Sequence, residues 1–471
     1  MTRRDFVQQA GLAAAAGVIG ACHPCPTDVS GAILGAVGGA PCETSHTFDN
    51  WAGTIRFRPR RFCRPTTEAQ VVAIVKDALA GGTRVRTQGA GHSFSQLLPT
   101  SDTLVSLDDV EVPVSVDGGR VTVSGGMRLK RLIPELRGRG LALRNLGSIT
   151  EQSIAGAFST GTHGSGVRLG AIATQVVGLR LVTGEGEVRT IGEQDQEDLA
   201  AARINVGALG IITAVTLDCV PHYQLEYTAY LTTFDEVIGR IDELVRQNVR
   251  VVLWWLLPAD CPRDTVVLIT KNPLDHAGGG IAPREGGAGT GVRRERLSKD
   301  PGALRRLAGR GARGTSGLKK VFHYVGDYDQ VLTIPLLPIF HRECEYAIPA
   351  DRATQALKEL RAIVEEGDVS LSLPVEVRFV AEDDILLSPA HGRAVCYIGA
   401  STLVNSTEVF ERFEPLMKRL GGAPHWGKNA TVTQQEVAAM YPATYERFRR
   451  VRDRYDPKRV FTNTLLSELF P

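Results

Sequence analysis

The sequence has almost no excess of charge, because 54 lysine and arginine residues stand against 52 aspartate and glutamate residues, a net charge of +2. This balance gives no electrostatic reason for binding nucleic acid or an anionic surface. Aromatic residues are few, at 6%, and none occurs in the Gly- and Arg-rich segment 276–320. Without aromatic side chains to stack on bases, this segment is interpreted as a flexible surface insertion rather than an anion-binding arm.

The chain also lacks a pair of cysteine motifs with zinc-like spacing, so no metal site is predicted. It has eight cysteines. The motif Cys22-x-x-Cys25 lies at a predicted processing site, where a redox role is not expected. If the protein is exported, a disulfide among Cys25, Cys42 and Cys63 is compatible with the sequence. The sequence does not say which two of them pair.

No apolar run near the N-terminus is long enough to cross a bilayer, since the run from Ala10 to Ala21 is too short for a spanning helix. The pair Arg3-Arg4 precedes this alanine-rich run, an arrangement that resembles a twin-arginine (Tat) export signal. Residues 1–22 are therefore predicted to be a signal peptide read by the Tat translocase, which exports folded proteins. The tetrapeptide IGAC ending at Cys22 resembles a lipobox, and simple cleavage after a small residue is the alternative. We expect a periplasmic protein, or one anchored by lipid at the outer face of the cytoplasmic membrane.

The remaining chain is predicted to be α+β. Residues 23–48 are expected to form a linker, residues 49–221 a first domain, and residues 222–471 a second domain. Helical spacing predicts a helix over Glu68 to Ala80, capped by Thr66 or Thr67 and ended by Gly81-Gly82. Further strands are expected at Thr83 to Thr87, Thr103 to Leu107, Arg120 to Ser124, Gly210 to Val220 and Val251 to Leu257. Helices are expected at Leu129 to Arg137 and Thr354 to Glu366, and a hairpin at Gln175 to Thr190.

A nicotinamide-binding fingerprint is absent. The stretch TQGAGHSFSQ places Gly89 and Gly91 on a strand-to-loop turn, but Phe94 stands where the third glycine of G-x-G-x-x-G should be, and no helix follows. The backbone amides of the loop are still suited to a pyrophosphate; they belong to Gly89, Ala90, Gly91, His92 and Ser93. A neutral imidazole is a competent nucleophile, so His92 suits a covalent bond to the electrophilic methyl of an oxidised flavin. A packed loop histidine is the alternative.

A second glycine-, serine- and threonine-rich segment, NLGSITEQSIAGAFSTGTHGSG, covers residues 145–166. Such a run lets the backbone approach a large flat ligand and donates N–H and hydroxyl hydrogen bonds.

Several segments together identify a family resemblance. GAGHSFS, the segment 145–166, ATQVVGLRLVT and GALGIITAVTL resemble the vanillyl-alcohol-oxidase-type (PCMH-type) FAD-binding flavoproteins. EYAIP, PVEVRFVAEDDILLSP, PHWGK and DPKRVFTNTL resemble the aldonolactone oxidases among them. The resemblance implies a two-subdomain FAD-binding domain followed by a cap (substrate) domain with an antiparallel sheet, whose C-terminal segment returns to the flavin.

The resemblance also implies roles for single residues. His92 would carry FAD covalently, and Ile212 would lie near the adenine. The residues expected to line the flavin ring and pyrophosphate are Ser148, Ser153, Gly156, Thr160, Thr162 and His163. Gly147 stands where related dehydrogenases have alanine and would leave space for O2, which favours an oxidase.

On the substrate side, period-two alternation in VEVRF places Glu376 and Arg378 on one face of a strand. By resemblance Arg378 would hold the substrate's oxygens, Glu376 would orient the hydroxyl, and Lys428 would stabilise the reduced flavin. A structural role for His425 is as plausible as a catalytic one. The general base stays open among Glu376, His425 and Lys428.

The implied reaction is oxidation of the C2 hydroxyl of a sugar-acid 1,4-lactone (L-gulono, L-galactono or D-arabinono), with O2 as acceptor giving H2O2. An alditol (xylitol, sorbitol) oxidase is a competing interpretation; the stretch CYIGAST lacks the histidine expected of such enzymes, although the alignment there is loose. A lactone dehydrogenase that uses another electron acceptor is also compatible with the sequence. A lipid-anchored protein that keeps flavin without turnover is disfavoured, because Glu376, Arg378 and Lys428 are all present.

Overall fold

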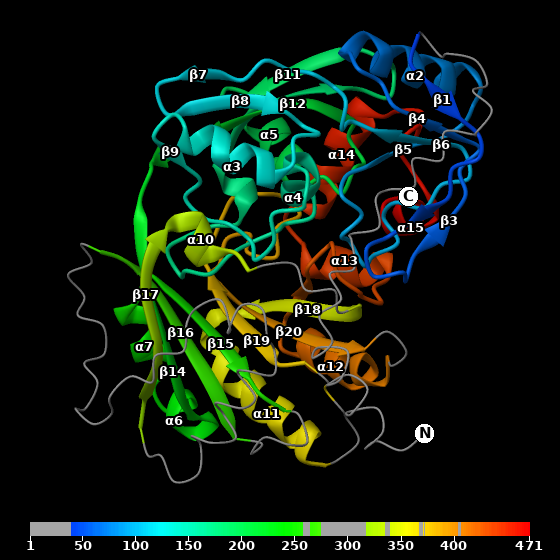
Figure 1. Ribbon diagram of the computed structural model, residues 1–471. Helices are drawn as coiled ribbons and strands as arrows, with labels where there is room; N and C mark the ends of the chain where they lie inside the picture. Colours follow the sequence, from blue (N-terminus) through cyan, green and yellow to red (C-terminus); the bar gives the residue numbers. More distant parts are fainter. Residues whose placement is uncertain are drawn as a thin grey trace, which may run out of the picture.

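The computed structural model describes residues 39–257, 264–274, 317–334, 340–366, 371, 373–403 and 407–471. The described chain forms two parts stacked one on the other (Figure 1). The predicted signal peptide 1–22, with Cys22 and Cys25, lies outside the described residues, as do most of the predicted linker 23–48 and most of the insertion 276–320. Among the described residues no helix is both long and apolar enough to cross a membrane.

Among the described residues the first part contains two two-stranded sheets, β2-β3 and β13-β9, and two larger sheets. The smaller has the strand order β1-β4-β6-β5, with β6 parallel to both β4 and β5. The larger has the order β11-β10-β12-β8-β7 and is antiparallel. The strands of this part are β1 (Cys42–Glu43), β2 (Phe48–Asp49), β3 (Arg56–Phe57), β4 (Arg61–Cys63), β5 (Val85–Gln88), β6 (Thr103–Ser106), β7 (Ser115–Asp117), β8 (Arg120–Ser124), β9 (Leu141–Ala142), β10 (Val176–Val182), β11 (Val188–Gly192), β12 (Ile211–Asp218) and β13 (Val220–Pro221). Its helices are α2 (Glu68–Ala80), α3 (Leu129–Arg137), α4 (Ile154–Ser159), η1 (Ile172–Gln175) and α5 (Gln196–Arg203).

Local sequence explains α2. The side chain of Thr67 accepts a hydrogen bond from the Gln70 amide, which caps the first turn. Gly81 ends the helix and Gly82 follows at φ +61°, in the left-handed region that glycine tolerates. The predicted helix, its cap and its end are confirmed.

The second part is built on an eight-stranded antiparallel sheet with the order β17-β14-β16-β15-β19-β20-β18-β21. Its strands are β14 (Gln224–Thr233), β15 (Arg250–Trp255), β16 (Thr265–Pro273), β17 (Lys319–Asp327), β18 (His341–Pro349), β19 (Val375–Val380), β20 (Val395–Leu403) and β21 (Ala423–Pro424). Its helices are α6 (Phe234–Ile238), α7 (Ile241–Gln247), α10 (Tyr328–Leu332), η2 (Ala350–Arg352), α11 (Ala353–Glu365) and α12 (Glu408–Arg419). This sheet confirms the antiparallel sheet expected for the second half of the chain.

The two faces of this sheet differ in chemistry. Val375, Val377 and Phe379 of β19 share a buried core with residues of α6, α7, α11 and α12, the helices drawn along one side of the sheet in Figure 1. Glu376 and Arg378 alternate with them and point to the opposite face. Directly opposed residues in antiparallel strands share a face, so the register extends this second face across the sheet. We call it the polar face; its functional side chains belong to Trp254, Lys271, Glu343, Glu345, Glu376, Arg378 and Tyr397.

The last helices return to the first part. They are α13 (Gln434–Met440), α14 (Tyr445–Tyr455) and α15 (Thr464–Leu469), and their apolar side chains belong to the same core as α3, α4 and α5. The Val85 amide donates to the Val460 carbonyl at 2.8 Å, and the Arg86 guanidinium donates to the Phe461 carbonyl at 2.5 Å. The end of the chain therefore completes the first part.

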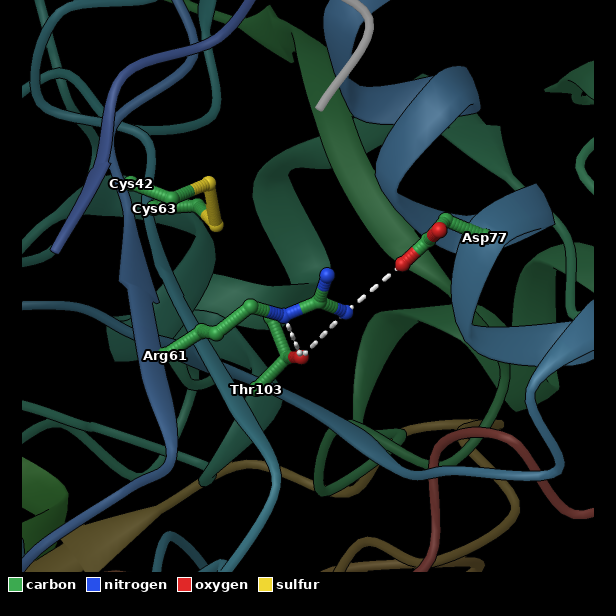
Figure 2. Close-up of a disulfide and its surroundings, with 5 residues drawn as sticks. All are labelled: Cys42, Arg61, Cys63, Asp77 and Thr103. Atoms are coloured by element: carbon green, nitrogen blue, oxygen red, sulfur yellow. Dashed lines mark hydrogen bonds and ion pairs between the residues drawn. A yellow bond between two sulfur atoms is a disulfide. The ribbon is translucent and has the colours of Figure 1, made fainter. Parts of the chain in front are cut away.

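Several ends of predicted segments differ from the structure by one or two residues, among them those of β5, β12, β15 and α11, and the predicted linker and insertion each lose residues to a strand. β1 lies inside the predicted linker, pairs with β4 and is joined to it by a Cys42–Cys63 disulfide. Figure 2 shows Arg61 of β4 beside this disulfide, with its guanidinium bonded to Thr103 of β6 and paired with Asp77 of α2 at 2.7 Å. At the other segment, Lys319 and Lys320 are the first residues of β17 rather than part of an irregular insertion.

Candidate active site

The polar face carries a braced carboxylate–guanidinium pair. Arg378 forms an ion pair with Glu376 and donates to the Ser148 hydroxyl at 2.6 Å. The other carboxylate oxygen of Glu376 accepts from the indole N–H of Trp254 at 2.9 Å. Burial lowers the pKa of Arg378, but Glu376 and Glu345 raise it above its ordinary value. Arg378 is thus a fixed cation, and both oxygens of Glu376 are engaged.

The glycine-, serine- and threonine-rich segment 145–166 joins the two parts of the molecule at this pair. Its Ser148 binds the Arg378 guanidinium, and the Gly166 amide donates to the Phe379 carbonyl at 2.5 Å. The Ser165 hydroxyl donates to the Val251 carbonyl. The segment predicted to contact a cofactor therefore lies directly against the strands that carry the predicted substrate residues.

A buried carboxylate, Glu345, lies beside two histidines. Its Oε1 is 3.3 Å from Nε2 of His163, whose ring stacks on Tyr397 at 3.6 Å between centroids. Nδ1 of His163 lies 2.9 Å from the Gly164 carbonyl, which can only accept, so Nδ1 carries a proton. Burial raises the pKa of Glu345, but His163, His425 and Lys428 together lower it to well below its ordinary value. Glu345 is therefore a buried anion.

His425 is held as a neutral ring. Its Nδ1 accepts from the Gly427 amide at 3.0 Å, so the proton of the neutral ring is on Nε2. Burial lowers its pKa to about 3. His163, Glu345 and His425 each place a potential ligand atom within 4.8 Å of the others. A metal would need lone pairs from both rings, and His425 uses its Nδ1 lone pair for Gly427, so this cluster is better suited to hydrogen bonding than to metal binding.

Lys428 makes a partly buried ion pair with Glu343, which stands two residues before Glu345 on β18. Burial would raise the pKa of Glu343, yet Lys428 lowers it to about 2. Burial would likewise lower the pKa of Lys428, but Glu343 and Glu345 raise it. Lys428 remains a cation, as the predicted role in charge stabilisation requires.

The Gly-rich loop adjoins this cation. The Phe94 amide donates to the Gly427 carbonyl at 2.8 Å, and the Lys428 ammonium lies 5.3 Å from the centroid of the Phe94 ring. His92 stacks on Trp51 at 5.6 Å between centroids. Burial lowers the pKa of His92 to about 4, so its imidazole is neutral at neutral pH.

The residues present fit a bound flavin nucleotide. Buried side-chain atoms without a hydrogen-bond partner among the described residues include Gln88 Oε1, Ser95 Oγ and Gln152 Oε1, all in or beside the two glycine-rich segments. A Cβ on Gly89 would lie 2.4 Å from Ser153 Oγ, so the two segments approach closely enough there to exclude a side chain. These features suit a ligand whose polar groups meet backbone and amide atoms.

The remaining predicted cofactor residues are in these segments, several with structural partners. Ser153 Oγ accepts from the Gly156 amide at 3.3 Å and caps α4, and the Thr160 hydroxyl donates to the Gly156 carbonyl at 3.0 Å. Thr162 Oγ1 accepts from Gln152 at 3.0 Å. Ala90 and Ser93 lie in the His92 loop. Ile212 is on β12, where its carbonyl would be 2.2 Å from a Cβ on Gly125, so Ile212 lies at the first part's sheet rather than at the polar face.

Sequence reasoning missed four side chains of the site: Glu343, Glu345, Tyr397 and Trp254. The stretch EYAIP served only as a family marker. The four residues Glu343 to Tyr346 (ECEY) nevertheless alternate polar and apolar side chains as VEVRF does, which is the signal that could have identified Glu343 and Glu345.

Comparisons with known proteins identify the relatives of this chain. The family described as "FAD binding domain" matches residues 59–192, and the family described as "D-arabinono-1,4-lactone oxidase" matches residues 303–469. The chain is 33% identical over 425 residues to L-gulono-1,4-lactone dehydrogenase of Mycobacterium tuberculosis, covering 89% of this chain and 98% of that protein. It is 30% identical over 442 residues to L-gulonolactone oxidase of Mus musculus, covering 90% and 98%. Among solved structures, a variant of cholesterol oxidase from Brevibacterium sterolicum superposes with a TM-score of 0.75 at 16% identity, covering 92% of this chain and 98% of that one.

Proposed function

This chain belongs to the aldonolactone oxidase branch of the PCMH-type FAD-binding flavoproteins, and from that premise we propose that it oxidises the C2 hydroxyl of a sugar-acid 1,4-lactone. The observation that carries the proposal is the Glu376–Arg378 pair, fixed by Trp254 and Ser148 and lying beside the segment suited to FAD. Relatives named for L-gulono- and D-arabinono-lactones support this substrate class.

The residues of the chain have distinct roles in this reaction. Arg378 binds the lactone oxygens through charge-assisted hydrogen bonds, and Glu376 orients the hydroxyl that is oxidised. Lys428, kept protonated by Glu343, stabilises the negative charge that appears on reduction. FAD, when bound, supplies the two-electron oxidant that takes the hydride from C2.

We further infer that His92 holds FAD covalently. Its imidazole is neutral and stacked on Trp51, the state in which the ring nitrogen is nucleophilic. A covalent bond would keep the cofactor with the protein through dilution and export.

Oxidase activity, with O2 as acceptor and H2O2 as product, is proposed over dehydrogenase activity because of Gly147. A Cβ there would lie 2.7 Å from the Thr162 methyl, so any side chain at this position would clash and glycine is favoured. The relative from Mycobacterium tuberculosis is named a dehydrogenase, which makes the acceptor a question for measurement.

The proposal is tested by mixing the purified flavoprotein without oxygen with L-gulono-1,4-lactone and, separately, with xylitol. Bleaching of the yellow flavin band by the lactone alone supports the lactone oxidation. Bleaching by xylitol would indicate an alditol oxidase, and bleaching by neither would refute the proposed substrate class. Admitting air after bleaching separates the acceptors: an oxidase recovers its colour faster with O2 than with a dye or cytochrome.

We also propose export by the Tat translocase, because Arg3-Arg4 precedes a short alanine-rich run. Export would place the protein in the periplasm or, with a lipid on Cys22, at the outer face of the cytoplasmic membrane. Replacing both arginines by lysine should retain the protein in the cytoplasm, and an unchanged distribution on cell fractionation would refute this. The mass of the mature N-terminus separates lipidation of Cys22 from simple cleavage.

A further inference from the structure

Removing the hydroxyl proton of the substrate requires a base. The three candidates named from the sequence each already have hydrogen-bond or ion-pair partners. Both oxygens of Glu376 are bonded, one to Arg378 and one to Trp254. Lys428 is a cation paired with Glu343. His425 directs its lone pair at the Gly427 amide and keeps its proton on Nε2. A carboxylate oxygen keeps a further lone pair after one hydrogen bond, so Glu376 can still orient the hydroxyl, whereas Lys428 and His425 offer no lone pair on the polar face.

Lys271 is a further titratable group on that face. It stands on β16, directly opposite Arg250 of β15 and Tyr227 of β14 in the register. On β15, Val252 stands opposite Arg378, and Arg250, two residues earlier, stands opposite Lys271, so Lys271 and Arg378 are diagonal neighbours across β15. The charges of Arg378 and Glu376 both act on Lys271, which places its amine within electrostatic range of this pair.

The amine of Lys271 makes no hydrogen bond or ion pair with any residue in the described part of the chain, and its nearest aromatic contact is the Tyr227 ring, 5.9 Å away at the centroid. The residue is only partly buried. The amine of Lys271, which has no partner among the described residues and shares a face with Glu376 and Arg378, is available to a ligand bound at that face.

The charges around Lys271 favour the neutral amine. Burial lowers its pKa, Arg378 and Arg250 lower it further, and Glu376 raises it, for a result of about 7. Tyr227 adds no charge, because burial raises the pKa of its phenol. Arg250 is fixed by the Arg144 carbonyl at 2.9 Å and the Tyr223 hydroxyl at 3.3 Å. A large fraction of the amine is therefore unprotonated near neutral pH, as a general base requires.

We propose that Lys271 is the catalytic base that accepts the proton of the lactone hydroxyl. As the O–H bond breaks, its proton joins the amine, which becomes an ammonium. The electron pair of the C2–H bond leaves with its hydrogen as hydride to FAD, so the substrate loses two electrons and two hydrogens, and the carbonyl forms. This role rests on the proposed lactone oxidation.

The first test measures the rate of flavin reduction by L-gulono-1,4-lactone, without oxygen, between pH 5 and pH 10. Wild-type protein should show a rate that rises with pH through an apparent pKa near 7. Lys271→Met should lower the rate about 100- to 1,000-fold, the range typical of a lost general base, and should lose that pKa. Lys271→Arg, which keeps a long cation but cannot become neutral, should show the same loss.

Lys320→Met, at an exposed lysine of β17, is the matched control and should behave as wild type. Flavin content and thermal unfolding establish that each variant is folded; if Lys271→Met does not fold, Lys271→Arg decides. Reduction within threefold of wild type and an unchanged pH profile in either folded Lys271 variant would overturn the proposal. Wild-type protein that no lactone reduces would instead overturn the lactone oxidation, and the role of Lys271 with it.

The second test does not depend on turnover. Trace acetylation of the flavoprotein at a series of pH values, followed by mass spectrometry of the peptides, gives the pKa of individual amines. Lys271 should titrate near 7 and react at lower pH than Lys320. If Lys271 titrates like an exposed lysine, near 10, the amine is protonated at neutral pH and the proposal fails.

Discussion

The Phe94 amide donates a hydrogen bond to the Gly427 carbonyl at 2.8 Å. This contact fixes the loop that carries His92 against the turn that carries His425 and Lys428. The residue proposed to hold FAD and the residue proposed to stabilise its charge are thereby positioned together, although they come from opposite ends of the described chain.

Replacing His92 with alanine should abolish covalent attachment of flavin. Wild-type protein should keep a fluorescent flavin band on a denaturing gel, because a bond to the imidazole survives unfolding. His92→Ala should release its flavin into the supernatant, while His323→Ala, a change on exposed strand β17, should retain it. Release of flavin from denatured wild-type protein would refute the covalent bond.

Replacing Arg378 with lysine should impair substrate binding. A single ammonium cannot reproduce the bonds from both terminal nitrogens of Arg378, in which Nη2 donates to Glu376 and Ser148 and Nη1 donates to the His163 carbonyl. The loss of charge-assisted bonds predicts a fall in kcat/KM of about 100-fold, mainly through KM. Arg361→Lys, on α11 behind the sheet, serves as the control. Steady-state kinetics within twofold of wild type for Arg378→Lys would contradict this role.

Replacing Glu343 with glutamine should destabilise the protein, by less than the about 3–5 kcal/mol typical of a fully buried pair, because it leaves the partly buried ammonium of Lys428 without its main counter-charge. The double variant Glu343→Gln/Lys428→Met should regain much of that stability, since the uncompensated charge is gone. Unfolding by urea measures both. Equal stability of the single and double variants would show that the ion pair is not the cause.

The free energy of unfolding should fall as the pH drops below about 6.5, because the folded protein holds His425 in its neutral form. Burial lowers its folded pKa to about 3 from an ordinary value of 6.5. Between these values the unfolded chain binds a proton that the folded protein does not, so the free energy of unfolding decreases by about 1.4 kcal/mol per pH unit. His425→Asn should flatten this dependence in denaturant titrations, and His323→Gln should not. An equally steep slope in His425→Asn would refute the assignment.

Removing the disulfide should lower the free energy of unfolding. The bond between Cys42 and Cys63 closes a loop with a sequence separation of 21 residues, and a loop of this length predicts a loss of about 3 kcal/mol. Cys42→Ala/Cys63→Ala and reduced wild-type protein should both unfold at lower denaturant concentration. Reductant should have no further effect on the double variant, and a further effect would point to another cause.

Several elements could be predicted from local sequence alone. The expected bounds of α2, α3 and β8 match the structure, because their caps and periodicity lie within a few residues. The alternation in β19 likewise indicated which side chains leave the core. These patterns depend on neighbours along the chain.

The assembly of the site could not be predicted in this way. Glu345 meets His163 and His425 because β18 lies beside β20 and β21, an order in space that differs from the order in sequence. Lys271 reaches the polar face through the register of two strand pairs, and a single lysine in a strand gives no local signal. The partner of Cys42 could not be predicted for the same reason, since the sequence allowed either Cys25 or Cys63.

The return of the C-terminal helices to the first part has a consequence for biosynthesis. The core around α3, α4 and α5 lacks α14 and α15 until translation is nearly finished. Strand β5 likewise lacks its hydrogen bond to the Val460 carbonyl until Val460 has been synthesised. Contacts between such distant positions make folding slow, and a ribosome-bound chain that ends before these helices cannot complete the core beside its own cofactor site. We therefore expect stable binding of FAD only after α14 and α15 have been synthesised and packed.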